Sequence, residues 1–464
     1  MSLKYQQITS KLEHWIRDEK KWIAGERLPS IRQLATDLSV SKNTIIHALT
    51  QLESKQIVEA RPKVGYFVRS KNKPLLTTTI DSLSAPSEVK IPELFRDIMM
   101  RSAAFDIKPN VESKPRSNHL VELNRYIHRA QRHNHANIDM YYDKPLGDAQ
   151  LRYEIAKRYR KRGLLVSPDD ICITAGCQHA LFLALFTLCQ PGDNVAVESP
   201  TFYGVVQLLE QLQLNVIEIP SSPEDGISTD HLSKALEQWK IKACVTTPNF
   251  ATPTGSILST AKRQALLSLA NTYDFHIVED DIYGELSFQG ETSPLKALDT
   301  AEKVILCGSF SKSLSRELRI GWIISTAFIQ PIVKAKLVTQ LASPQAIQQA
   351  LARFLSDGHY RRHLTVFKTQ LLHHKHQLET VLNKYFPKET KYTSPEGGIA
   401  LWVELPETVN TTELYNKALT ENIVVTPGQL FSNKGQYANF LRISFNHPIV
   451  GVRSQAIKKL SKML

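Results

Sequence analysis

Three short segments carry residues that could do chemistry, and each follows an apolar run. Lys312 lies between two serines after VILCG, in the segment GSFSKSLSRELRIGW. Asp280 and Tyr283 follow FHIV, and the turn AGCQHAL (175–181) follows DICIT. A lysine amine can form a Schiff base with pyridoxal phosphate, a carboxylate can keep the ring nitrogen protonated, and free helix amides suit the phosphate. The alternative is structural, because most lysines are solvated and acidic residues can simply end a strand.

The elements around these segments must bring them together. From about Ile91, apolar runs of strand length alternate with helical patterns; the runs are ICIT, NVAVES, NVIEIP, ACVTTP, FHIVED and VILCGS. This alternation predicts an α/β fold, with a mostly parallel sheet flanked by helices. Ligands bind such sheets beyond the carboxyl ends of the strands. We therefore expect Lys312, Asp280 and the AGCQHAL turn to meet at that edge.

The first seventy residues have a different pattern. Apolar residues at helical spacing predict a helix around Ile8–Ile16 and a short second helix over residues 28–38. Ser41 is a good N-cap for a third helix, and IVEARPKVGYFVR (57–69) has the pattern of two short strands around a turn. This is the layout of a winged helix-turn-helix, which presents a helix to the major groove. Taken alone, the pattern equally fits a small helical cap with a basic face.

Composition narrows the class of protein. The 464 residues exceed what one core usually supports, and the net charge of +12 suits an anionic partner. The five cysteines are scattered and form no CxxC, which favours reduced thiols in a cytoplasm over disulfides or zinc. No apolar stretch is long enough to predict a membrane span, and the first residues lack a signal-peptide pattern. Two histidine clusters (128–135 and 373–376) lack a completing carboxylate or cysteine, so we expect no metal site.

The segment from residue 25 to residue 68 resembles the winged helix-turn-helix of the GntR family. The matching motifs are LPSIRQLA, VSKNTI, ALTQL and GYFV. Lys42 stands where the family usually has arginine, and because lysine cannot make the planar bidentate contact that reads guanine, we expect it to hold a phosphate. The resemblance implies double-stranded DNA as a partner, contacted by or near Arg32, Ser41, Lys42, Asn43, Thr44, Lys63 and Gly65.

The remainder resembles a fold-type I aminotransferase, and the whole chain resembles the MocR subgroup of GntR regulators. The motifs, in order, are YDKPLGDAQLR, TAGCQHAL, ESPTFYG, PTG, EDDIYGE, SFSK, LRIGW, PEGGIALWVEL and LRISF. The resemblance implies a pyridoxal-phosphate-binding domain with a smaller C-terminal α/β subdomain. We expect the winged helix-turn-helix over residues 1–69, a flexible linker over 70–90 and the aminotransferase-like domain over 91–464.

The resemblance also implies roles for individual residues. Lys312 would form the Schiff base, Asp280 would pair with the pyridine nitrogen, and Tyr283 would bond the ring hydroxyl. Arg442 would receive the carboxylate of an amino-acid ligand. Tyr142 would reach the phosphate of the neighbouring subunit in a homodimer. The other implied cofactor contacts are Gly176, Cys177, Gln178, Phe202, Thr252, Ser309, Ser311 and Arg319.

Two departures from the aminotransferase pattern bear on function. Thr252 stands before PTG where asparagine is usual, and residues 106–120 lack the glycine-containing stretch that usually lines the substrate site. We therefore predict a cytoplasmic transcription regulator that senses an amino acid or amine, or the cofactor itself. Two alternatives stay open: an aminotransferase with an accessory DNA-binding domain, and a DNA-binding protein whose second unit only dimerises.

Overall fold

The chain divides into two compact units, Met1–Pro74 and Leu75–Leu464. The computed structural model describes residues 4–17, 19, 21–22, 26–54, 57–61, 65–68, 83–89, 93–100, 107–108, 118–136 and 142–464. In the described part of the chain, no helix is long and apolar enough to cross a membrane.

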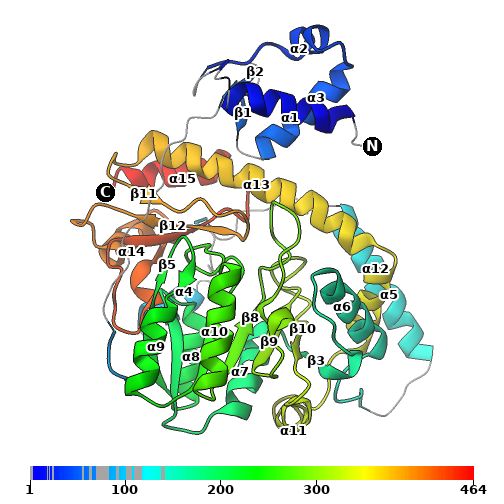
Figure 1. The fold of residues 1–464 in the computed structure, drawn as a ribbon, viewed down its shortest axis with the longest axis vertical. Coiled ribbons are helices and arrows are strands. Elements are labelled where there is room, and N and C mark those ends of the chain that lie inside the picture. The colour runs from blue at the N-terminus through cyan, green and yellow to red at the C-terminus, as the bar shows by residue number, and fades with distance from the viewer. Residues whose placement is uncertain are drawn as a thin grey trace. The chain divides into compact units, whose positions relative to one another are not determined.

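The first unit is a three-helix bundle followed by a hairpin (Figure 1). Its elements are α1 (Lys4–Arg17), α2 (Ile31–Asp37), α3 (Lys42–Ser54), β1 (Val58–Arg61) and β2 (Gly65–Val68). The two strands pair antiparallel, as predicted for a wing. The predicted apolar face of α3 is fully buried against α1 and α2 and consists of Ile45, Ala48, Leu49 and Leu52.

The second unit is built on an eight-stranded sheet in the order β3-β10-β9-β8-β7-β4-β5-β6 (Figure 1). The central pairs β9–β8, β8–β7, β7–β4 and β4–β5 are parallel, which confirms the predicted α/β fold. β10 is antiparallel to both neighbours; it lies in the LRIGW segment, which the sequence marked as a motif and not as a strand. The strands are β3 (Ile171–Thr174), β4 (Asn194–Ser199), β5 (Asn215–Ser222), β6 (Gly226–Ile227), β7 (Ile241–Thr246), β8 (His276–Asp280), β9 (Val304–Ser309) and β10 (Gly321–Ile324).

Helices cover both faces of this sheet because successive strand residues point to opposite sides. In β4, Val195 and Val197 pack in one core with α7 and α8, whereas Ala196 packs in another core with α9 and α10. The helices around the sheet are α5 (Asn118–Ala136), α6 (Ala149–Lys161), α7 (Cys177–Leu188), α8 (Tyr203–Gln211), α9 (Thr229–Gln238), α10 (Thr260–Thr272), α11 (Ile329–Thr339) and α12 (Gln345–Ser356), with short 3-10 turns at Pro168–Asp170 and Leu295–Leu298.

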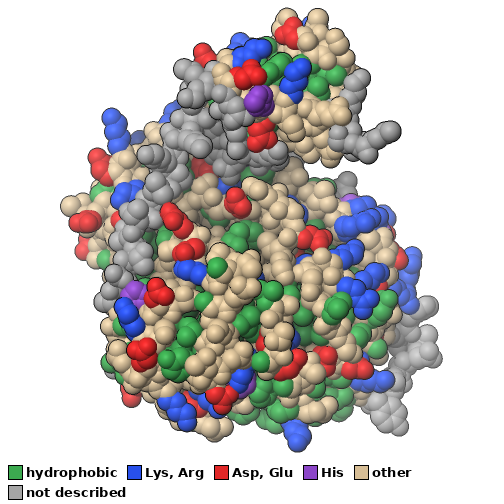
Figure 2. Space-filling view, viewed as in Figure 1, with side chains coloured by type: hydrophobic (Ala, Val, Ile, Leu, Met, Phe, Trp, Pro, Cys, Tyr) green, Lys and Arg blue, Asp and Glu red, His purple; other side chains and the backbone are tan. Residues whose placement is uncertain are grey.

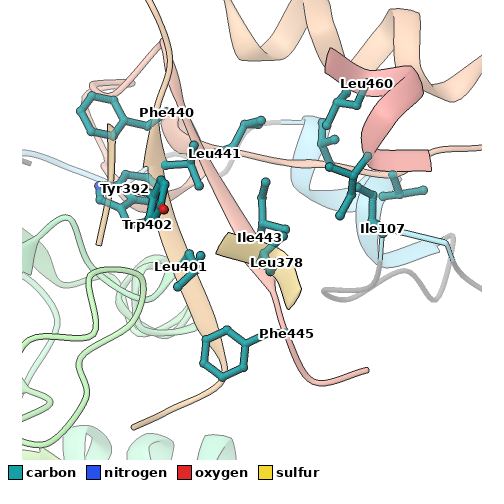
Figure 3. Packing of buried hydrophobic residues seen from close by; sticks show 14 of the residues in the cluster. Ile107, Leu378, Tyr392, Leu401, Trp402, Phe440, Leu441, Ile443, Phe445 and Leu460 are labelled. Carbon is teal, nitrogen blue, oxygen red and sulfur yellow. The ribbon is translucent and has the colours of Figure 1, made fainter. Parts of the chain in front are cut away.

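A smaller C-terminal subdomain is present, as predicted. Its four strands form an antiparallel sheet in the order β11-β12-β14-β13, and its core contains Trp402, Leu441 and Leu378 (Figure 3). Helix α4 (Glu93–Met100), from the start of this unit, contributes Phe95 and Ile98 to the same core. The remaining elements are α13 (His359–Tyr385), β11 (Lys391–Tyr392), β12 (Ala400–Glu404), α14 (Thr411–Leu419), β13 (Thr426–Pro427), a 3-10 turn (Gly428–Phe431), β14 (Phe440–Ser444) and α15 (Gly451–Ser461).

The segment expected to be a linker (70–90) is partly a component of the second unit. Ser87 forms a β-bridge with Val216, and the Asn433 amide donates to Ser87 Oγ at 3.2 Å. Val89 is buried in a core of the large sheet. Residues 83–89 therefore pack before Ile91, because this stretch adds both a strand-edge bond and an apolar side chain to the domain. Residues 70–82 and 90 of the expected linker lie outside the described residues.

Candidate cofactor site and nucleic-acid interface

Three strand ends meet at one edge of the large sheet, as the sequence predicted. β3, β9 and β8 lie in the order β3-β10-β9-β8, and their last residues are Thr174, Ser309 and Asp280. Lys312 lies in the turn after β9, partly buried, and its charge lowers the pKa of Asp280. The lysine and the aspartate are thus close enough to act on each other electrostatically.

The turn between β3 and α7 forms a cradle for an anion. Gly176 has a φ of +92°, a left-handed conformation that glycine adopts without strain. A Cβ at this position would lie 2.8 Å from Arg319 Nη2, so the guanidinium packs directly over the glycine. Arg319 also donates to the Ala175 carbonyl at 2.8 Å. An arginine next to the first turn of α7 places a cation and free backbone amides together.

Asp280 is a buried carboxylate at the floor of the site. Its Oδ1 accepts a bond from the Cys177 thiol at 3.2 Å and one from the Ile282 amide at 3.2 Å. Burial raises the pKa of Asp280 to about 6, while the bonds from Cys177 and Ile282 and the charge of Lys312 oppose the rise. A cation placed against this carboxylate would favour the ionised form, because the pair offsets the cost of burying the charge.

The two acidic neighbours of Asp280 have structural partners. Glu279 accepts bonds from the amides of Leu295 and Lys296, at 2.7 and 2.8 Å. Asp281 forms a bidentate ion pair with Arg162, at 2.5 and 2.8 Å. Of the three consecutive acids, only Asp280 therefore lies beside both the lysine turn and α7.

Cys177 had two interpretations, a reactive thiol or a small residue beside the phosphate. Its side chain is buried, and burial, with the charge of Asp280, raises its thiol pKa well above the ordinary value. The helix dipole is therefore not the dominant influence, and the thiol acts as a hydrogen-bond donor to Asp280. All five cysteines are free and buried.

Aromatic residues form another wall. The Phe202 ring packs against Gly204, and its centroid lies 4.7 Å from that of Tyr203. Burial raises the pKa of Tyr203; Arg442 and Arg316 lower it and Tyr283 raises it, so all three lie around this phenol. Arg442, on β14 of the small subdomain, is buried. The Gln178 side chain bonds the Gly204 carbonyl at 2.7 Å, tying α7 to α8.

Ser309 and Ser311 are buried in the turn that carries Lys312, and Ser309 Oγ accepts a bond from the Ser311 amide at 3.1 Å. The next serine, Ser313, was missed by the sequence analysis. The Tyr360 hydroxyl lies 2.7 Å from Ser313 Oγ and donates to Glu285 at 2.6 Å. No sequence signal pointed to these contacts, because Tyr360 lies on α13, far along the chain.

Two further predicted positions have distinct surroundings. Thr252 is partly buried, and Asn249 does not take its place: the Asn249 amide donates to the Ser293 carbonyl at 3.1 Å and accepts from Arg263 at 2.8 Å. Tyr142 is 75% exposed. An exposed phenol at this position fits a contact with a second subunit, which stays a prediction.

In the first unit, the residues predicted to meet DNA lie at the N-terminal end of α3 and on α2. Arg32, Ser41, Lys42 and Asn43 are exposed, and Thr44 is partly exposed. Ser41 Oγ accepts a bond from the Thr44 amide at 3.1 Å, which caps α3 and orients its first turn. Gly65 begins the second strand of the wing with a φ of +127°, whereas Lys63 lies outside the described residues.

The site fits pyridoxal phosphate on two observations. The cradle at Gly176 is open only because no Cβ is present there, and Arg319 supplies a cation beside it. Asp280 is a buried carboxylate at the position where a protonated ring nitrogen would offset its burial. A mostly parallel sheet that presents lysine, aspartate and this cradle at its carboxyl edge defines the class of fold-type I pyridoxal-phosphate domains.

Comparison with known proteins agrees with this class. Residues 4–68 match the gntR family of bacterial regulatory proteins, and residues 113–455 match aminotransferase class I and II. The chain is 35% identical to the HTH-type transcriptional regulator YjiR of Escherichia coli, over 99% of this chain and 98% of YjiR. It is 28% identical to the HTH-type transcriptional regulator TauR of Rhodobacter capsulatus, over 95% of this chain and 92% of TauR.

A solved structure shows the same second unit. Kynurenine aminotransferase from Pyrococcus horikoshii, crystallised with PMP, matches 81% of this chain and 95% of its own, with a TM-score of 0.72 and 29% identity. The chain belongs to the HTH-type transcriptional regulators of the MocR type, which join a GntR winged helix to an aminotransferase class I and II domain. The predicted family, fold and DNA-binding role are confirmed; the roles of the individual site residues stay predictions.

Proposed function

We propose that this regulator binds pyridoxal phosphate in its second unit and responds there to an amino acid or amine. The observation that carries the proposal is the meeting of Lys312, Asp280 and the Gly176–Arg319 cradle at one sheet edge, in a chain whose first unit is a winged helix. A ligand that favours one arrangement of a dimer over another would shift the spacing of the paired winged helices on DNA.

The bound cofactor supplies an aldehyde and an electron sink. The residues of this chain supply the rest. Arg319 and the first amides of α7 bind the phosphate, and Asp280 holds a proton on the ring nitrogen by offsetting its charge. Phe202 packs against the ring, and Lys312 presents the amine that a ligand amine would displace. Arg442, buried on β14, would receive a ligand carboxylate from the small subdomain.

A second candidate is a working aminotransferase, and the presence of Lys312, Asp280 and Arg442 together favours it. Against it stands Thr252, whose place is not filled by Asn249 because that amide is bonded to Ser293 and Arg263. A scaffold without a ligand would have no use for a buried aspartate beside the lysine turn. The cofactor itself could also be the signal, in which case its concentration and not that of an amine would control DNA binding.

The test is an absorbance spectrum of the purified full-length protein, titrated with amino acids and amines and then with a keto acid. A yellow protein whose spectrum shifts once and stays shifted supports the sensor. Repeated loss and recovery of the absorbance on adding amine and then keto acid identifies turnover and supports the second candidate. Lys312→Ala should remove the yellow absorbance, whereas Lys334→Ala, an exposed lysine on α11, should keep it.

We also propose a homodimer in which Tyr142 reaches the partner's cofactor phosphate, supported by its 75% exposure. Tyr142→Phe should weaken cofactor affinity while leaving the sedimentation profile of the dimer unchanged. Unchanged affinity in a dimeric Tyr142→Phe protein would contradict this role.

A further inference from the structure

A second cavity lies on the opposite side of the Asp281–Arg162 ion pair from Asp280's neighbours in α7. It has a volume of about 190 Å3 and is lined by α6, the loop 284–291 and α13. A cavity of roughly 150 Å3 holds a molecule the size of benzene, so this one has room for a small organic ligand. None of the predicted cofactor or ligand contacts lines it.

The lining is rich in cations that come from two helices. Arg158, Lys161 and Arg162 share one face of α6, at spacings of three and four residues. Arg361 and Lys368 lie seven residues apart on α13, with Thr365 between them on the same face. Figure 2 shows lysine and arginine side chains gathered over this part of the second unit, at the right.

The charges of the cavity do not balance. Two of its cations are already paired, Arg158 with Glu285 and Arg162 with Asp281. The other three cations are Lys161, Arg361 and Lys368. Among the described lining residues, the only remaining carboxylate is Glu291. Burial lowers the pKa of Lys368, which Glu285 and Glu291 oppose; a bound anion would act in the same direction as these carboxylates.

Hydrogen bonds connect this cavity to the lysine turn. Glu285, which pairs with Arg158, also accepts a bond from the Tyr360 hydroxyl at 2.6 Å, and that hydroxyl lies 2.7 Å from Ser313 Oγ. The Arg158 guanidinium lies 4.0 Å from the centroid of the Tyr360 ring. Ser313 directly follows Lys312. An anion that draws Arg158 away from Glu285 would therefore alter the contacts of the residue next to the lysine.

We infer that this cavity is a binding site for a small anion that carries a phosphate or carboxylate group, held by Lys161, Arg361 and Lys368. The hydroxyl of Thr365 adds a neutral donor. Both phosphate and carboxylate are recognised by such cations. A small ligand is favoured over DNA because two of the cations, Arg158 and Lys368, are partly buried in a cavity and do not stand on an open surface that a duplex could follow.

The test is isothermal calorimetry on the full-length protein with inorganic phosphate and, separately, succinate, against chloride at equal ionic strength. We expect saturable binding of one anion per chain, and the tighter of the two identifies the headgroup. The double variant Arg361→Gln/Lys368→Gln should weaken binding by roughly tenfold or more, because two charge-assisted bonds are lost. The matched control is Arg362→Gln, an exposed neighbour on α13 that bonds the Asp357 carbonyl and should bind like the wild type.

Three results would overturn the inference: heats no larger than those of chloride, equal affinity in the double variant, or an equal loss in Arg362→Gln. A double variant that binds nonspecific duplex DNA more weakly, where the wild type shows no small-anion binding, would assign these cations to nucleic acid instead. The calorimetry does not depend on a cofactor, so its outcome is separate from that of the proposed function. The link to the lysine turn rests on that function: saturating anion should shift the visible absorbance, and Tyr360→Phe should bind the anion without the shift.

Discussion

The sharpest test of the cofactor site is Asp280→Asn, because it should make the apoprotein more stable and the cofactor weaker. The folded pKa of Asp280 is about 6, against an ordinary 3.8, because the carboxylate is buried. Between these values the folded protein keeps a proton that the unfolded chain has released. The stability of the wild type therefore falls as the pH rises through this window and is level above it.

The magnitude follows from the shift. About two pH units at roughly 1.4 kcal/mol each give on the order of 3 kcal/mol of destabilisation above pH 6. Asparagine keeps the shape and an oxygen that can accept from Ile282 and Cys177, but it carries no charge. We expect the apo variant to gain about 1–3 kcal/mol at pH 8 and little at pH 4. Other buried acids, such as Glu198 with a pKa of about 7, titrate in both proteins and cancel in the difference.

The assay is urea unfolding of both apoproteins at pH 4.5 to 8, with the cofactor dissociation constant measured at pH 8. Loss of the charged partner of the ring nitrogen should weaken cofactor binding by roughly ten- to a hundredfold. The control is Asp281→Asn, which leaves the buried Arg162 without its bidentate partner and should destabilise by about 3–5 kcal/mol. The reasoning is refuted if apo Asp280→Asn is no more stable than the wild type at pH 8, or if it binds the cofactor equally well.

Three further predictions concern both units. Lys42→Ala should weaken operator binding and lower the salt slope by about one; an unchanged slope in filter-binding or anisotropy titrations would mean that Lys42 contacts no phosphate. Gly176→Ala should weaken cofactor binding, seen as a higher dissociation constant by fluorescence, because φ is +92° and the Cβ would lie 2.8 Å from Arg319 Nη2. Removal of residues 1–74 should abolish specific DNA binding and keep the yellow absorbance; specific binding by the truncated protein would contradict the interface on α3.

Periodic features of the sequence predicted the main elements. The buried face of α3, the Ser41 cap and the six apolar runs appear where they were expected, because helix and strand periodicities are local properties of the chain. β10 was missed, since four residues inside a motif offer too short a pattern to separate a strand from a turn. Residues 83–89 were expected to be linker, because a single apolar residue such as Val89 gives no periodicity until its partner surface is known.

The sequence by itself determined which residue types follow each strand, and hence that a lysine, an aspartate and a glycine turn would share one sheet edge. It could not decide which of three consecutive acids serves the site. That choice depends on partners far along the chain: Arg162 takes Asp281, the amides of Leu295 and Lys296 take Glu279, and Asp280 is left to Cys177 and Lys312. The tertiary structure alone brought α6 and α13 together around a cationic cavity, because contacts between distant segments arise from packing and leave no mark in local sequence spacing.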